Sequence, residues 1–453
     1  MEFKSINPYN DKVLETFPEQ SDRQVNAILN KAENASRQWR RTFFANRAEI
    51  MTEAADILVK NADQYAKTIT LEMGKPISES RAEIKKCAFV CEFYAQNAEK
   101  FLTNKTIETD TWESFVRYEP LGCILAIMPW NFPFWQVFRF AASALMAGNV
   151  GLLKHAPNVF RCALHAEEIF RQAGCPDGVF QNLLIHHDRV EKIIENKIVK
   201  AVTLTGSEQA GASVAAIAGK NIKKTVLELG GSNAFVVLED ADIDKAVEIG
   251  ITARMMNTGQ SCIAAKRFIL VEKVYDEFVS KFIKGVQKLK AGDPLDDNTQ
   301  VGPLARKDLA DQLHKQVRKS VEQGAEIRLG GNQKNTFYEP TVLTNVTPAM
   351  SIFKEETFGP VAPIIKVKNE EEAFKIAEQT KFGLGISLFT RNIEKAQKFI
   401  DKVSDGSFFI NDLVKSDPRL PFGGTKYSGY GRELSKDGIM EFVNKKTVCI
   451  KTL

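Results

Sequence analysis

The chain of 453 residues is long enough for about three domains, at a usual size of about 150 residues each. Hydrophobic residues make up 44% and charged residues 26%, which is ordinary globular usage and excludes a disordered or fibrous chain. The 61 Lys and Arg residues exceed the 57 Asp and Glu residues by only 4, and they are spread along the chain, so we expect no nucleic-acid partner.

The cysteines and the neutral segments indicate the compartment. Seven cysteines in a long chain favour reduced thiols over a disulfide framework, and the polar N-terminus lacks the apolar core of a signal peptide, so we expect a cytoplasmic protein. Residues 120–153 carry a single charge, Arg139, and are long enough to span a membrane. Pro129, Asn131 and Pro133 would break such a helix, so we expect a buried strand, loop and helix, and no membrane contact.

The order of the elements predicts the fold class. The first hundred residues are expected to be helical, with a cap at Ser21 and Asp22 and an amphipathic run to Lys60. Short Val- and Ile-rich runs then alternate with helical stretches, which is typical of an α/β chain with largely parallel sheets. The expected strands are 122–127, 150–153, 201–204, 233–238 and 268–271. The pair Gly230 and Gly231 stands between two such series and predicts a boundary between two α/β domains.

The C-terminal tail predicts one further strand. After Gly431 the chain has a helical stretch and then residues 446–450, where apolar residues alternate with polar ones. No partner strand is evident nearby. Segment 101–118 contains two strand-like stretches, 106–107 and 115–118, and could form a hairpin that pairs with this tail.

Cys262 is the candidate nucleophile. It follows the small polar turn 257–261 and precedes an apolar strand, whereas the other cysteines have apolar or helical neighbours that suit core positions. A thiolate at such a turn could attack an electrophilic carbon. Cys87 and Cys91 share a helical face, but no His or Cys pair follows at zinc spacing, and the five histidines form no metal pattern. We therefore expect no metal site.

Two further residues could take part in catalysis. Glu228 stands inside an apolar strand that ends in two glycines, and burial would raise its pKa and suit it to be a general base. A paired structural carboxylate is an equal alternative for Glu228. Asn131 is an amide between two prolines and could donate to a developing oxyanion, or simply cap a turn.

A possible phosphate site follows the strand at 201–204. Thr205, Gly206 and Ser207 form a turn, and Gly211 stands at the start of an Ala-rich helix, where backbone N–H groups at a positive helix end could meet a phosphate. The spacing is not the usual dinucleotide pattern. A plain turn capped by Ser207 is therefore an equal alternative.

These motifs together resemble the aldehyde dehydrogenase superfamily. The resemblance lies in Cys262 after Gly259 and Gln260, in Glu228 within Leu-Glu-Leu-Gly-Gly, and in the Pro-Trp-Asn-Phe-Pro segment around Asn131. Further segments agree in the same order across almost the whole chain: Lys154 after an apolar strand, 205–211, 355–360 and 421–433. The short chain and segments 153–158 and 416–422 look like the shorter, bacterial type of succinate-semialdehyde dehydrogenase.

The resemblance implies a three-part α/β subunit. Residues 1–100 and 121–230 would form a Rossmann-like dinucleotide-binding domain, and residues 231–430 a catalytic domain. Residues 101–120 and 431–453 would form a small β oligomerisation flap. The flap would pair the C-terminal strand with a sheet in a neighbouring subunit and cover an exposed edge, so we expect a homodimer or homotetramer.

The resemblance also implies a mechanism with NAD or NADP as cofactor. The Cys262 thiolate attacks the aldehyde, and the Asn131 amide and the Cys262 N–H hold the oxyanion of the thiohemiacetal. The nicotinamide takes a hydride, and a water deprotonated by Glu228 hydrolyses the thioester. Lys154 and Glu356 would bind the two riboses, Trp130 and Ser207 would lie near the phosphates, and Phe358 near the nicotinamide ribose. The expected cofactor-binding residues are Trp130, Lys154, Thr205, Gly206, Ser207, Gly211, Leu229, Glu356 and Phe358.

The expected substrate is succinate semialdehyde, oxidised to succinate. Arg139 would grip its distal carboxylate, although an internal salt bridge is the alternative for a buried arginine. Longer family members carry a second arginine where this chain has Met256, and Arg254 or Arg419 could replace it. The remaining pocket residues would be Trp135, Ser261 and Phe422.

Other functions stay open. The alternative aldehydes are glutarate semialdehyde and simple aliphatic ones. A cysteine hydrolase would need a histidine partner, and no histidine has a recognisable context. A non-catalytic relative would lack the thiol or the acid, and both are present. Pro157 stands where a cofactor-selecting Glu or Ser is usual in the family, which predicts NAD use with appreciable NADP use.

Overall fold

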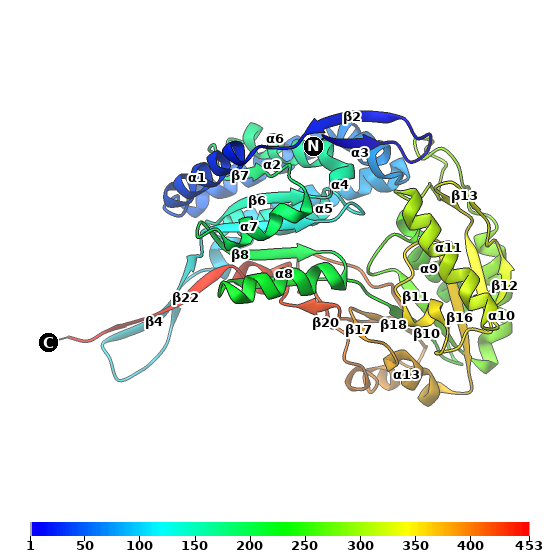
Figure 1. Ribbon diagram of the computed structural model, residues 1–453. Helices are drawn as coiled ribbons and strands as arrows, with labels where there is room; N and C mark the ends of the chain where they lie inside the picture. The colour runs from blue at the N-terminus through cyan, green and yellow to red at the C-terminus, as the bar shows by residue number, and fades with distance from the viewer. Residues whose placement is uncertain (1, 453) are drawn as a thin grey trace.

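The computed structural model describes residues 2–452. It has two α/β units side by side, and a slender flap that extends away from the first unit (Figure 1). The chain begins with an antiparallel hairpin of β1 (Glu2–Ile6) and β2 (Val13–Pro18), which the expectation of a purely helical N-terminus missed. Buried and exposed side chains alternate along β1, whereas in β2 only Phe17 is buried, and the hairpin is too short and polar to stand out in the sequence.

Four helices follow the hairpin. Ser21 caps the first of them and forms a capping box with Gln24, as the sequence predicted for this start. The amphipathic run to Lys60 is divided into two helices by a break at residues 40–43. The four helices are α1 (Asp22–Trp39), α2 (Phe44–Lys60), α3 (Ala62–Met73) and α4 (Ile77–Phe101).

The first sheet has six strands in the order β21-β9-β8-β5-β6-β7, and all but β21 are parallel. The predicted strands near 122–127, 150–153 and 201–204 are confirmed as β5, β6 and β8. The strands and the helices between them are β5 (Cys123–Met128), α5 (Trp135–Met146), β6 (Val150–His155), α6 (Phe160–Gln172), β7 (Phe180–Asn182), α7 (Val190–Glu195), β8 (Val199–Thr205), α8 (Glu208–Lys220), β9 (Lys224–Glu228) and β21 (Gly429–Tyr430).

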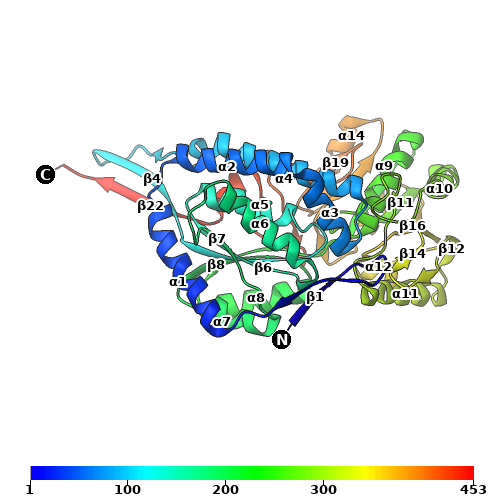
Figure 2. The ribbon, with the colours of Figure 1, turned by 90° about the horizontal axis from the view of Figure 1, so that it is seen from above.

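The order of this sheet locates a ligand site. From β5 the chain builds outward through β6 and β7, and then returns to add β8 and β9 on the other side of β5. The carboxyl ends of β5 and β8 therefore lie at a switch point, where open α/β sheets bind ligands. Helices α5 and α6 pack on one face of the sheet, and α1 and α8 contact it as well (Figure 2).

The second sheet has seven strands in the order β12-β15-β16-β11-β10-β18-β19. The predicted strands near 233–238 and 268–271 are confirmed as β10 and β11. Because side chains alternate along β10, Val236 lies in a core with α11 and α13, whereas Phe235 lies in a core with α9 and α10. The elements are β10 (Asn233–Val237), α9 (Ile243–Met255), β11 (Ala265–Val271), α10 (Glu272–Val286), α11 (Lys307–Glu322), β12 (Glu326–Leu329), β15 (Thr341–Thr344), α12 (Ser351–Lys354), β16 (Val361–Val367), α13 (Glu370–Glu378), β18 (Ile386–Phe389), α14 (Ile393–Gln397) and β19 (Phe408–Ile410).

The flap is a three-stranded antiparallel sheet of the order β22-β4-β3. Its strand β22 pairs with β4 over its whole length, from Val443 opposite Pro120 to Ile450 opposite Glu113. The predicted hairpin pairing with the tail is therefore confirmed. The elements are β3 (Lys105–Thr106), β4 (Glu113–Pro120), the preceding helix α15 (Ser435–Met440) and β22 (Val443–Ile450).

Strand β9 belongs to the first sheet and β10 to the second, so the chain changes sheet near residues 230–231, and the domain ranges themselves stay a prediction. One strand departs from the proposed ranges: β21 falls inside residues 231–430 but pairs with β9 of the first sheet. Two small sheets complete the structure, formed by β13 (Gln333–Lys334) with β14 (Phe337–Tyr338) and by β17 (Phe382–Gly383) with β20 (Thr425–Lys426).

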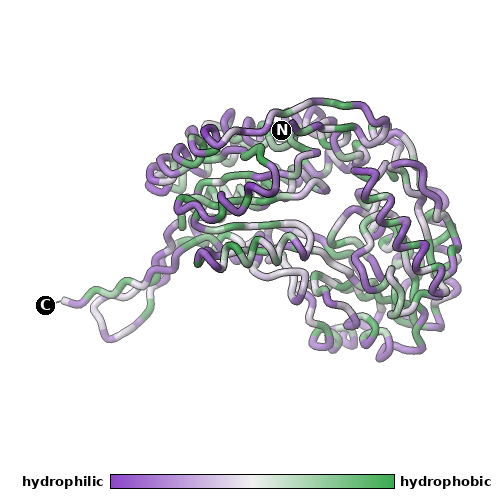
Figure 3. Tube along the Cα trace, in the orientation of Figure 1, coloured by the Kyte–Doolittle hydropathy of each residue, from purple (hydrophilic) through white to green (hydrophobic). Residues whose placement is uncertain are grey.

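Figure 3 shows hydrophobic colour along the strands of both sheets, while outer helices alternate between hydrophobic and hydrophilic residues. No helix within residues 2–452 is both long and apolar enough to cross a membrane. The segment 120–153, which raised that question, forms strand β5, an irregular loop, the buried helix α5 and the start of β6.

Candidate active site

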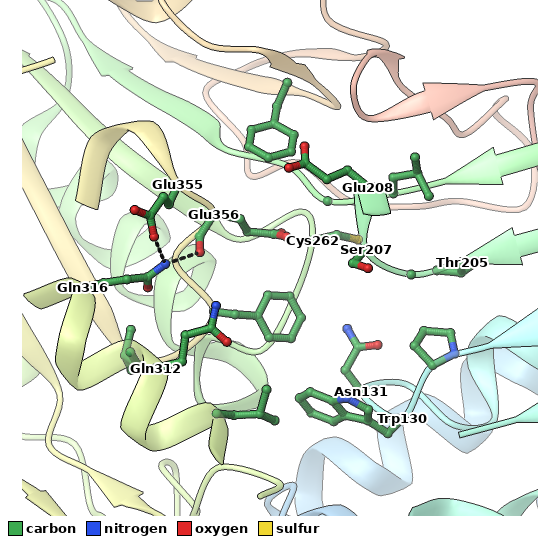
Figure 4. A pocket seen from close by; sticks show the side chains of 18 of the residues that line it. Trp130, Asn131, Thr205, Ser207, Glu208, Cys262, Gln312, Gln316, Glu355 and Glu356 are labelled. Atoms are coloured by element: carbon green, nitrogen blue, oxygen red, sulfur yellow. Dashed lines mark hydrogen bonds between the residues drawn. The ribbon is translucent and has the colours of Figure 1, made fainter. Parts of the chain in front are cut away.

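A pocket of about 400 Å³ lies between the two α/β units (Figure 4). On one side it is bounded by the loop after β5 and the turn after β8, both at the switch point of the first sheet. On the other side it meets the loops that precede β11 and β16, at the amino ends of the second sheet. The expected site residues that line it are Trp130, Asn131, Thr205, Gly206, Ser207, Leu229, Cys262, Glu356 and Phe358.

The loop that carries Cys262 is bent by left-handed backbone. After α9 ends, Asn257, Thr258 and Gly259 have φ values of 54°, 54° and 71°, an unusual conformation for the first two. The amide of Asn257 donates to the backbone oxygens of Asn131 at 2.7 Å and of Gln260 at 3.0 Å, which ties this loop to the loop after β5. The strained turn therefore aims Cys262 into the pocket.

Arg254 holds the same loop from behind. Its fully buried guanidinium donates to the backbone oxygens of Ala265 at 3.0 Å, Gly259 at 2.8 Å and Gly359 at 2.7 Å. Because both terminal nitrogens of Arg254 donate to backbone carbonyl groups, and only its Nε lacks a partner within residues 2–452, we interpret Arg254 as a structural residue. It does not supply the second carboxylate contact that the sequence left open.

The Cys262 thiol lies in a low-dielectric setting. Burial raises its pKa to about 11, and the charges of Glu356 and Glu228 act in the same direction, while Lys266 and Arg139 oppose them. Lys266 donates to the Cys262 backbone oxygen at 3.0 Å and to Glu356 Oε1 at 2.5 Å. At neutral pH the resting thiol is thus mostly protonated, and attack requires a base.

Asn131 is held in one orientation. Its Oδ1 accepts from Gln136 Nε2 at 3.1 Å, and its Nδ2 donates to the Gln260 backbone oxygen at 3.0 Å. The amide thereby presents N–H toward the Cys262 loop, as an oxyanion donor would (Figure 4). Its partner Gln260 belongs to a distant segment, so the alternative of a simple turn cap does not describe this side chain.

Glu228 is the last residue of β9, level with Thr205 at the end of β8. It is buried, its Oε1 has no hydrogen-bond partner among residues 2–452, and it makes no ion pair there. Burial raises its pKa well above the usual value, and the neighbouring Glu433 adds to this, while Arg139 and Arg432 oppose it. Because Glu228 makes no ion pair and lies near a second carboxylate, the general-base interpretation is favoured over that of a paired structural carboxylate.

Arg139 forms the internal salt bridge that the sequence left open. Its Nε pairs with the buried Glu433, its NH2 group donates to Thr205 Oγ1 at 3.4 Å, and its guanidinium lies 4.9 Å from the Phe422 ring centroid. The exposed Arg419 pairs with Asp417 at 2.6 Å. Both arginines expected to bind a substrate carboxylate thus have carboxylate partners in the chain, and their role toward substrate stays a prediction. The other expected substrate residues, Trp135, Ser261 and Phe422, are buried.

The helix α8 offers a place for a phosphate. Ser207 caps it by accepting from the Ala210 N–H at 3.3 Å, so the capped turn exists, and the first-turn N–H groups face the pocket end of the helix. Gly211 does not line the pocket. A Cβ there would lie 2.6 Å from the Leu229 methyl groups, so this glycine lets the helix pack on the strand end.

The remaining cofactor candidates differ in position. Glu356 lines the pocket and accepts from the Gly231 N–H at 3.0 Å. Trp130 and Phe358 face each other edge to face, with ring centroids 5.8 Å apart. Lys154 lies in β6 outside the pocket lining, where burial lowers its pKa. Aromatic faces, a positive helix end and small glycines fit a dinucleotide in this pocket.

The structure also identifies residues that the sequence did not single out. Gln136 orients Asn131, and Lys266 bridges the Cys262 loop to Glu356. In the sequence, Gln136 stood out only as a polar residue inside an apolar helix, and Lys266 only as a lysine inside an apolar strand. Within residues 2–452 no group of three or more His, Cys, Asp or Glu side chains could hold a metal ion.

Comparison with known proteins identifies the family. The profile of the aldehyde dehydrogenase family matches residues 1–448. A Synechocystis protein named as a probable NADP(+) succinate-semialdehyde dehydrogenase is 51% identical over 453 residues, which cover 99% of this chain and 100% of that protein. A Mycobacterium tuberculosis protein named NADP(+) succinate-semialdehyde dehydrogenase 1 is 48% identical, with coverages of 99% and 100%.

Solved structures agree. The succinic semialdehyde dehydrogenase of Streptococcus pyogenes, in complex with NADP+, is 39% identical with a TM-score of 0.97, and the match covers 99% of this chain and 100% of that one. The succinate-semialdehyde dehydrogenase of Burkholderia pseudomallei is 34% identical with a TM-score of 0.97, covering 100% and 95%. With a matching profile over nearly the whole length, and with the Cys262 thiol and the Asn131 amide lining one pocket next to the strand end that carries Glu228, the chain belongs to the aldehyde dehydrogenase family.

Proposed function

We propose that this enzyme oxidises succinate semialdehyde to succinate with NADP or NAD. The observation that carries the dehydrogenase chemistry is the meeting of Cys262, the oriented Asn131 amide and the helix end at Ser207 in one pocket. The substrate rests on the names of the relatives, which are 48–51% identical over their full length. NADP is favoured because the same names carry it, while Pro157 presents no carboxylate that would repel a 2′-phosphate.

The first half of the reaction forms a bond between Cys262 Sγ and the aldehyde carbon. The thiol proton leaves to a base, and the buried Glu228 carboxylate, with its raised pKa, is suited to take it. The carbonyl oxygen becomes an oxyanion, which the Asn131 amide and the Cys262 backbone N–H stabilise. When bound, the nicotinamide supplies the hydride acceptor that this oxidation needs.

The second half hydrolyses the thioester. Glu228 first releases the thiol proton to solvent. A water then attacks the acyl carbon as Glu228 takes its proton, and the Cys262 sulfur leaves as a thiolate, which takes up a proton again to restore the resting thiol. The same two N–H groups stabilise the second oxyanion. One aldehyde and one water thus give one carboxylate, and two electrons leave as a hydride.

A panel of aldehydes tests this proposal. The assay follows the absorbance of the reduced nicotinamide. Of the three aldehydes succinate semialdehyde, glutarate semialdehyde and butanal, the first should give the highest kcat/KM. A higher efficiency with butanal would refute the substrate assignment but leave the dehydrogenase chemistry. The same panel with each cofactor tests the cofactor: a preference for either beyond about 10³-fold, on the order of 4 kcal/mol, would require a selecting contact other than Pro157.

The proposed surroundings are a cytoplasmic homodimer or homotetramer. All seven cysteines are free thiols, which suits a reducing compartment. Strand β22 is an edge strand of the flap, and an unpaired edge favours association with another subunit. Mass measurement by light scattering, before and after removal of residues 443–453, would test this role. The domain ranges 1–100 with 121–230, 231–430, and 101–120 with 431–453 are part of the same proposal.

A further inference from the structure

Lys86 is a cation that makes no ion pair with any of the described residues 2–452. It projects from α4 and is partly buried, with its amine 4.2 Å from the Trp135 ring centroid and 2.7 Å from Ser416 Oγ. Within residues 2–452 no carboxylate lies within ion-pair distance of this amine. A partly desolvated ammonium that is held only by a neutral hydroxyl and an aromatic ring can accept an anion.

The carboxylates nearest in the structure are already engaged elsewhere. Glu83 pairs with Lys75 and also accepts from the backbone N–H groups of Phe134 and Trp135, at 2.8 and 2.9 Å. Asp417 accepts from the Arg419 guanidinium at 2.8 and 2.6 Å. Lys86 is thus free to pair with an incoming carboxylate.

The position of Lys86 connects it to the reacting centre. Helices α4 and α5 pack side by side (Figure 2), and Trp135, against which the amine lies, begins α5 four residues after Asn131. Trp135 and Arg139 are four residues apart on α5 and therefore share a face. Arg139 in turn donates to Thr205 Oγ1 at 3.4 Å, and Thr205 lines the same pocket as Cys262.

We propose that Lys86, together with the Ser416 hydroxyl, binds the distal carboxylate of the aldehyde substrate. This inference rests on the proposed function and names the charge that selects a carboxylated aldehyde. Arg139, which forms an ion pair with Glu433, then lines the site, and Lys86 of α4 supplies the unpaired positive charge. Succinate, the proposed product, should bind the same amine.

Three variants test this role. Lys86→Met removes the charge and keeps the length of the side chain, Lys86→Arg keeps the charge, and Lys85→Met removes the exposed neighbouring lysine as a matched control. The kcat/KM of Lys86→Met should fall about 10- to 100-fold for succinate semialdehyde, the effect of one charge-assisted hydrogen bond. Its loss for butanal should be at least tenfold smaller, and Lys86→Arg should recover most of the selectivity.

Inhibition by succinate gives a second measure that does not depend on the carboxylated aldehyde. Succinate should compete with butanal, and its inhibition constant should rise in Lys86→Met by a similar factor but stay unchanged in Lys85→Met. Equal losses for both aldehydes, or unchanged succinate inhibition in Lys86→Met, would overturn the inference while the dehydrogenase function stands. If the parent enzyme itself shows no preference for succinate semialdehyde over butanal, the proposed function fails first.

The pH dependence supplies a third measure. Burial lowers the pKa of Lys86 to about 8, repulsion from Arg139 adds to this, and Cys87, Asp417 and Glu83 oppose it. The amine is therefore charged below about pH 8 and neutral above. The ratio of kcat/KM for succinate semialdehyde to that for butanal should fall as pH rises through this value, and Lys86→Arg should keep the ratio flat. A flat ratio in the parent enzyme would contradict the assignment.

Discussion

Replacing Glu228 by Gln separates the two halves of the reaction. The substitution keeps the shape of the side chain but removes its ability to take a proton, so hydrolysis of the thioester loses its base. General-base help contributes about 10²- to 10⁴-fold in rate, and steady-state turnover should fall by that factor. The Cys262 thiol can still lose its proton to solvent hydroxide, so attack should persist at a lower rate and the variant should accumulate an acyl group on this residue.

Mass spectrometry after mixing the variant with aldehyde and cofactor should find the acyl group on Cys262. The parent enzyme should also gain activity as pH rises, because burial and the neighbouring Glu433 raise the pKa of Glu228 and only its ionised form can take a proton, and Glu228→Gln should lack this rise. Cys262→Ala should give no adduct. Turnover of Glu228→Gln at the parent rate, or an adduct on another cysteine, would refute the assignment of base and nucleophile.

Three further outcomes follow from the contacts. Arg139→Leu should lower the free energy of unfolding by about 3–5 kcal/mol, because it leaves Glu433 buried without its partner. Thermal unfolding measures this loss. An unchanged melting temperature would contradict the structural interpretation of Arg139. Gly211→Val should raise the KM for the cofactor by a larger factor than the KM for the aldehyde, since the new side chain collides with Leu229. A rise of both KM values by the same factor would refute this. Ser207→Ala should cost about 1 kcal/mol of stability through the lost cap, as measured by urea unfolding, and no loss would show that the cap contributes nothing.

The alternation of strands and helices could be predicted because it follows from local patterns. The central strands are largely apolar and buried on both faces, and such runs can be recognised in the sequence alone. They are β5, β6, β8, β10 and β11. The hairpin β1–β2 was missed because few of its residues are buried: Phe3 and Ser5 in β1 and only Phe17 in β2. Its register depends on packing against distant elements such as Phe160.

The site could be predicted only where residue type alone decides the chemistry. Cys262 stands out by its polar turn, and Asn131 by the prolines beside it. The partner of Arg139 could not be read from sequence, because Glu433 lies about three hundred residues away and meets it only through the fold. That Lys86 is partly buried and makes no ion pair could not be predicted either, because neighbouring lysines in a helix usually face solvent.

The meeting of the two sheets explains why these charges are arranged as they are. The pocket faces the carboxyl ends of the first sheet, where β9 delivers Glu228, and the amino ends of the second, where the loop before β11 delivers Cys262. Burial raises the pKa of both Glu228 and the Cys262 thiol, and the Glu228 charge adds to the rise for the thiol, so the site needs positive charge nearby to remain reactive. Lys266 and Arg139 provide it, but each is already paired with a glutamate. A substrate that carries its own negative charge therefore has to find its cation elsewhere, and an unpaired Lys86 on α4 meets that requirement without disturbing the pairs that tune the thiol.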